Sequence, residues 1–97
     1  MAYGACTSTG KLTSSQAIVR RSGLLSSCLV RTDGTNAATV TIYDNTEASG
    51  KILGDWVVQG ATGYGGRNWP EGAFTPFDNG LYISISGTGA WAIVEYI

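Results

Sequence analysis

The fold is decided by the stretch Leu81-Tyr82-Ile83-Ser84-Ile85-Ser86, in which large apolar side chains at every second position alternate with Tyr82 and two serines. Neighbouring residues of a β-strand point to opposite sides of the sheet, so this alternation predicts a strand with one buried face. The next residues, Gly87-Thr88-Gly89, predict a tight turn that closes a hairpin into a last strand over residues 90–97.

The same alternation continues in both directions along the chain. In the segment from Ala38 to Asp44, Ala38, Val40 and Ile42 are expected to face the core. Further strands are predicted over residues 16–20, 24–31 and 51–59, with a short one over 73–77 that Pro76 confines to a sheet edge. No segment keeps the three-to-four-residue apolar spacing of a helix. Six to seven short strands predict an all-β fold, a small antiparallel sandwich or barrel.

The length of 97 residues fits one domain, because a chain of this size cannot divide its core in two. We assign residues 16–97 to that β domain. Residues 1–15 carry no strong core pattern, and we expect them to form an arm or extended segment, laid on a neighbouring subunit or disordered. The segment from Met1 to Cys6 lacks a basic region and an apolar run, so synthesis in the cytosol is expected.

The segment from Gly60 to Asn68 contains four glycines, which predicts a loop that is mobile or held by a partner. Tyr64 and Arg67 lie in this loop and Trp69 follows it, and these residue types often dominate binding energy at protein interfaces. The alternative is that Trp69 packs over one end of the core.

The last predicted strand has two largely apolar faces. If Ala92, Val94 and Tyr96 fill the core, then Trp91, Ile93 and Ile97 form an exposed apolar stripe, which interfaces need and monomers avoid. The alternative is that the domain itself covers both faces. The predicted protein interface consists of Tyr64, Arg67, Trp69, Trp91 and Ile93.

Composition supports an interface and disfavours several other functions. Only 13% of residues are charged, about half the usual share, and the net charge is −1. No nucleic-acid partner is expected, because the chain has no cluster of cations beyond Arg20 and Arg21. No membrane span is expected either. Histidine is absent, which removes the commonest general base and metal ligand, so we expect no enzyme activity, no metal and no cofactor.

The two cysteines, Cys6 and Cys28, are 22 residues apart and match no metal or redox motif. A thiol made in the cytosol stays reduced, so both are expected to be free rather than joined by a disulfide. Cys28 lies in an apolar run and is predicted to be a small buried hydrophobe.

Two stretches of the chain, "TDGTNAATVTIYD" (residues 32–44) within residues 29–50 and "GLYISISGTGA" (residues 80–90), resemble small virion proteins of tailed bacteriophages. The resemblance covers about half the chain, leaves out the glycine-rich segment and the first fifteen residues, and carries no catalytic signature. It implies a β-sandwich and a structural role in the virion, as a capsid decoration (cement) protein. A neck, tail or fibre component is the neighbouring possibility.

The resemblance further implies that the partners are the major capsid protein or other virion proteins. It also favours a trimer among possible homo-oligomers, since decoration proteins often sit on threefold positions. A second reading from the residues is a carbohydrate-binding module, in which Tyr64, Trp69 and Trp56 would stack on sugar rings.

Overall fold

The computed structural model describes residues 6–97, which form nine strands and one short 3₁₀ turn. The elements are β1 (Thr7–Ser8), β2 (Gln16–Val19), β3 (Gly23–Arg31), β4 (Ala38–Tyr43), β5 (Ile52–Val58), η1 (Gly60–Thr62), β6 (Tyr64–Asn68), β7 (Thr75–Phe77), β8 (Leu81–Ser86) and β9 (Trp91–Tyr96).

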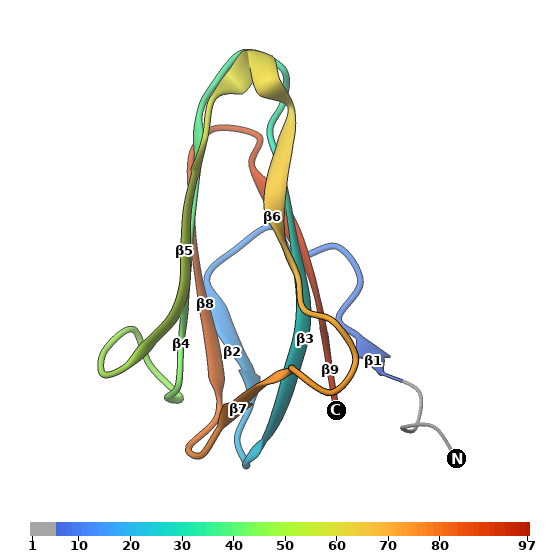
Figure 1. The fold of residues 1–97 in the computed structure, drawn as a ribbon. Coiled ribbons are helices and arrows are strands. Elements are labelled where there is room, and N and C mark those ends of the chain that lie inside the picture. Colours follow the sequence, from blue (N-terminus) through green and yellow to red (C-terminus); the bar gives the residue numbers. More distant parts are fainter. Residues whose placement is uncertain (1–5) are drawn as a thin grey trace.

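These strands form two antiparallel sheets that pack face to face, so the all-β prediction is confirmed and the fold is a sandwich rather than a barrel. Sheet A has the order β1-β9-β3-β6, with β7 pairing with the first part of β3, and sheet B has the order β2-β8-β4-β5. Figure 1 shows β4, β5 and β8 on one side of the molecule and β3, β6 and β9 on the other.

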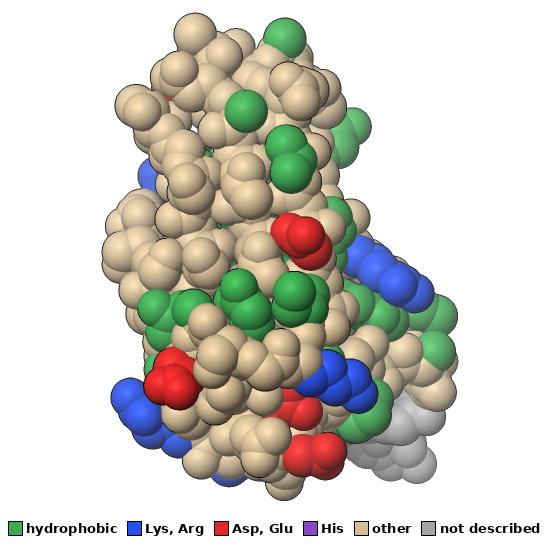
Figure 2. All heavy atoms as spheres, turned by 90° about the vertical axis from the view of Figure 1, so that its left-hand side faces the viewer, with side chains coloured by type: hydrophobic (Ala, Val, Ile, Leu, Met, Phe, Trp, Pro, Cys, Tyr) green, Lys and Arg blue, Asp and Glu red, His purple; other side chains and the backbone are tan. Residues whose placement is uncertain are grey.

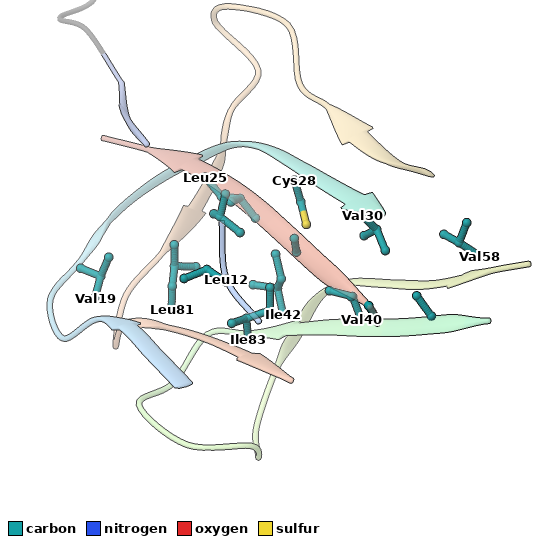
Figure 3. Packing of buried hydrophobic residues seen from close by; sticks show 14 of the residues in the cluster. Leu12, Val19, Leu25, Cys28, Val30, Val40, Ile42, Val58, Leu81 and Ile83 are labelled. Atoms are coloured by element: carbon teal, nitrogen blue, oxygen red, sulfur yellow. The ribbon is translucent and has the colours of Figure 1, made fainter. Parts of the chain in front are cut away.

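The core lies between the sheets and consists of the inward-facing residues of the long strands. Sheet A contributes Val30, Ala92 and Val94, and sheet B contributes Val40, Ile42 and Ile83, all of which are fully buried. Figure 3 shows side chains from both sheets pointing toward one another across this layer. The inward positions predicted for residues 38–44, 81–86 and 90–97 are confirmed, with Ile85 and Tyr96 only half-buried at the margin of the core.

The predicted hairpin between residues 81–86 and 90–97 is wrong. β8 lies in sheet B between β2 and β4, whereas β9 lies in sheet A between β1 and β3. The turn at residues 87–89 therefore carries the chain from one sheet to the other. Gly87 permits this crossing, because its φ is +122° and a side chain there would collide with the carbonyl oxygen of Ala37.

The segment before Gln16 contributes to the domain. β1 pairs with β9, Leu12 forms an isolated bridge with Ala92, and the Leu12 side chain is buried in the core. The sandwich therefore begins before residue 16, and residues 7–12 lie on this chain's own sheet rather than apart from it. Residues 1–5 of the expected arm lie outside the described residues.

A buried carboxylate fixes the turn between β7 and β8. Asp44, which follows β4, accepts hydrogen bonds from the backbone N–H of Asp78 (3.0 Å to Oδ1) and of Asn79 (2.8 Å to Oδ1). Burial raises the pKa of Asp44, but backbone hydrogen bonds from Asn79, Asp78 and Gly80 and the charge of Lys51 outweigh it, so the pKa lies below its ordinary value. Asp44 therefore stabilises the fold as a charged group.

We expect Ile83→Ala to lower the free energy of unfolding by about 2–4 kcal/mol, and Val94→Ala by somewhat less, because each opens a cavity in the closed core. Chemical denaturation measures both values. Ser84→Ala is the matched control, since Ser84 follows Ile83 on the same strand but points outward. If the two core variants unfold at the same denaturant concentration as this control, the assignment of the core is wrong.

We expect Asp44→Asn to cost about 1–3 kcal/mol at neutral pH, because the amide replaces a charged acceptor of backbone N–H groups. The folded-state pKa of Asp44 is lowered, so its contribution is present above the unfolded value of 3.8 and is lost as pH falls through the folded value. The stability difference between variant and parent should therefore shrink on acidification. Glu71→Gln, at an exposed carboxylate in the turn after β6, is the control. A constant difference across this pH range would contradict the assignment.

Candidate protein-binding surface

The outward side of sheet A, called face A below, is built from three rows of residues that the strand register places side by side. The rows are Tyr64, Arg31 and Trp91, then Gly66, Leu29 and Ile93, then Asn68, Ser27 and Glu95. Directly opposed residues of neighbouring strands share one side of the sheet, so all nine lie on face A.

Trp91 is the centre of a cationic cluster on face A. The guanidinium of Arg31 lies 5.6 Å from its ring centre and the ammonium of Lys11 lies 4.9 Å from it. A cation over an indole ring is attracted by the negative face of the ring, so the two charges are held on face A. Glu95 is the only carboxylate in the three rows, and it accepts a hydrogen bond from Ser27 Oγ at 2.9 Å.

The middle row of face A is apolar and hollowed. Leu29 is 38% exposed, Ile93 beside it is half-buried, and Gly66 supplies no side chain. A side chain at Gly66 would collide with the carbonyl oxygen of Cys28. The result is a hollow of about 390 Å³ along β3 and β6, bordered by Leu29, Tyr64 and Asn68. A surface of this kind can receive an apolar side chain of another molecule.

The predicted interface residues divide between this face and the core. Tyr64, which is 64% exposed, Trp91 and Ile93 come together on face A. Trp69 is only 5% exposed and belongs to the core cluster, so its predicted place in the interface is wrong and the alternative reading holds. Arg67 is opposed to the inward-facing Cys28, and its guanidinium lies 4.8 Å from the ring centre of Trp69. Arg67 therefore covers Trp69 at the sheet edge.

The glycine-rich segment is more ordered than its composition predicts. Residues 60–62 form η1, and β6 pairs with β3 over five residue pairs. The glycines allow the backbone of β6 to lie close to that of β3. The number of glycines alone does not distinguish such a strand from a free loop. Tyr64 is therefore presented on a strand next to Arg31.

The opposite surface, the outward side of sheet B, is called face B. Its strands contain a single charged residue, Asp55, which accepts a hydrogen bond from Thr41 Oγ1 at 3.0 Å. One row crosses the sheet through Ala17, Tyr82, Tyr43 and Ile52, and Val57 lies further along β5. Figure 2 shows hydrophobic side chains crossing this side in a row, with acidic and basic side chains below the row and one acidic side chain above it. Ile52 and Val57 are 53% and 65% exposed, and their place at a sheet edge is not visible in the sequence.

Residues 6–97 contain no group of three or more His, Cys, Asp or Glu side chains that could hold a metal ion. Cys28 is free and buried, and burial raises the pKa of its thiol to about 12, so the group stays protonated and packs as an apolar side chain. Cys6 is free and exposed. No helix in this part of the chain has the length and hydropathy needed to cross a membrane.

Comparison of the chain with protein-family models, with curated protein sequences and with solved structures found no match.

The two tryptophans should respond differently to substitution. Trp69→Ala is expected to lower the free energy of unfolding by about 3–5 kcal/mol, because it removes a buried indole from the core. Trp91→Ala should cost much less, because the Trp91 ring lies on face A under two cations. Equilibrium denaturation of both variants measures the difference. Equal losses would show that Trp91 is part of the packed core.

Proposed function

We propose that this chain is a non-enzymatic structural protein of a bacteriophage virion, a capsid decoration (cement) protein that binds the head through face A. Its partners are the major capsid protein or other virion proteins, and it acts as a homo-oligomer. A neck, tail or fibre component remains the second structural role. The virion setting rests on the resemblance of residues 29–50 and 80–90 to small phage virion proteins.

The observation that carries the proposal is the apolar, cation-bearing surface that this chain leaves uncovered on face A. Leu29 and Tyr64 expose large apolar area there, and Trp91 and Arg31 are residue types that contribute strongly at interface centres. The rest of the surface is rich in small uncharged side chains, which lose little conformational entropy when a partner covers them.

The carbohydrate-binding alternative receives less support from the arrangement of aromatic rings. Of the three rings expected to stack on sugar, Trp69 is buried and Trp56 is half-buried against the core, which leaves only Tyr64 well exposed. A sugar-binding platform needs several rings open to solvent. Binding of the isolated protein to a glycan array would favour this alternative.

Quantitative mass spectrometry of purified particles of the encoding virus tests the proposal. We expect the chain to be present, with a copy number comparable to that of the major capsid protein; a far smaller number would indicate a neck or tail component. Absence from the particle would contradict any virion role.

Substitutions on face A test how the chain attaches. Trp91→Ser and Leu29→Ser should abolish or strongly reduce incorporation into particles while leaving the circular dichroism spectrum unchanged, because both side chains lie on the outward side of sheet A. Arg20→Ser, at an exposed cation after β2, is the control that should be incorporated normally. Normal incorporation of both face A variants would show that attachment uses another surface.

A further inference from the structure

The exposed large apolar side chains of residues 6–97 fall into two pairs, one on each face of the sandwich. Leu29 and Tyr64 lie beside Arg31 on face A. Ile52 and Val57 lie on either side of Asp55 along β5. On face A a cation therefore lies next to two exposed apolar side chains, one on its own strand and one on the neighbouring strand, and on face B an anion lies between two exposed apolar side chains of one strand.

From this pairing we infer that face A of one copy of the chain binds face B of another copy. The contact uses the same surface as the proposed function, so within an assembly only a copy whose face A is still free can bind the head, and in that respect the inference rests on the proposed function. Opposite charges within matching apolar surroundings attract and fix the relative position of two surfaces, which is the usual sign of a specific contact.

Charge complementarity supports this choice of partner. Arg31 and Lys11 both lie over Trp91 on face A, and the single carboxylate in the rows of that face, Glu95, is hydrogen-bonded to Ser27. The strands of sheet B carry Asp55 as their only charged residue. Two copies meeting through face A alone would bring together two surfaces that each carry Arg31 and Lys11 and only one carboxylate, so the opposite face offers the better match of charge.

The spacing along the strands fits the same contact. Leu29 and Arg31 are two positions apart on β3, and Asp55 and Val57 are two positions apart on β5, so both pairs span about 6–7 Å on one side of a strand. Sheets that pack face to face keep their strands within about 30° of each other. With β3 of one copy antiparallel to β5 of the next, Arg31 lies over Asp55 while Leu29 lies over Val57. The hollow beside Gly66 is next to Leu29 and can receive a further apolar group.

This contact also predicts the type of assembly. It joins two different surfaces on opposite sides of the molecule, so each added copy leaves a new face A or face B free. The assembly therefore grows as an open row, unless the rotation between successive copies closes the row into a ring. The trimer favoured by the resemblance is a closed assembly. Sedimentation velocity distinguishes a series of increasing size from one trimeric species.

A charge-swap experiment with the full chain tests the inference. Arg31→Glu and Asp55→Arg should each weaken self-association at least about tenfold, because every contact then opposes like charges. An equimolar mixture of the two variants should recover it, since each variant then meets opposite charge on both of its faces. Arg20→Glu and Glu71→Arg make the same changes of charge at exposed positions outside the strands and should associate like the parent.

The outcomes separate this inference from the proposed function. A parent chain that stays monomeric, a closed trimer that is unaffected by Asp55→Arg, or a mixture that fails to recover association each overturns the contact between faces A and B. If the chain is nevertheless found in particles and needs Trp91 for incorporation, the proposed function stands. Self-association that follows the charge-swap pattern in a chain absent from virions supports the contact and overturns the virion role.

Discussion

The structure depends on one packing constraint: the inward side chains of β3 and β9 must fill the space above those of β4 and β8. Val30, Val40, Ile42, Ile83 and Val94 are fully buried in that layer. Because a strand alternates its side chains, fixing the inward set fixes every outward residue as well. Slipping β9 by one residue would bury Trp91 and Ile93 and expose Val94. Both faces are therefore consequences of the core.

The residues that follow a strict period of two were predictable from the sequence. The alternation in residues 38–44, 81–86 and 90–97 gave the correct inward side chains, because burial on one side of a strand requires apolar residues at every second position. The outward position of Trp91 and Ile93 followed from the same periodicity. Pro76 was correctly predicted to lie at a sheet edge, where β7 pairs with β3 alone.

The partners of each strand were not predictable in the same way. A turn such as Gly87-Thr88-Gly89 joins two strands of one sheet or crosses between two sheets with similar residues, and only packing across the core distinguishes the two. The strand at residues 64–68 was missed because its glycines serve close backbone contact with β3. Trp69 was misplaced because its burial depends on packing into the core and on Arg67 lying over its ring, and neither is visible in the sequence.

The repeated passage of the chain between the two sheets has a consequence for the kinetics of folding. Among the described strands, β4 and β5 are the one pair of chain neighbours that also pair in a sheet. Every other ladder joins segments that are separated by at least one intervening strand, so its formation must first overcome the entropy of closing a long loop. Proteins dominated by such distant contacts fold in about milliseconds to seconds. We therefore expect slow folding in which the β4–β5 hairpin is the earliest local structure, and in which faces A and B exist only after the last strand has joined its sheet.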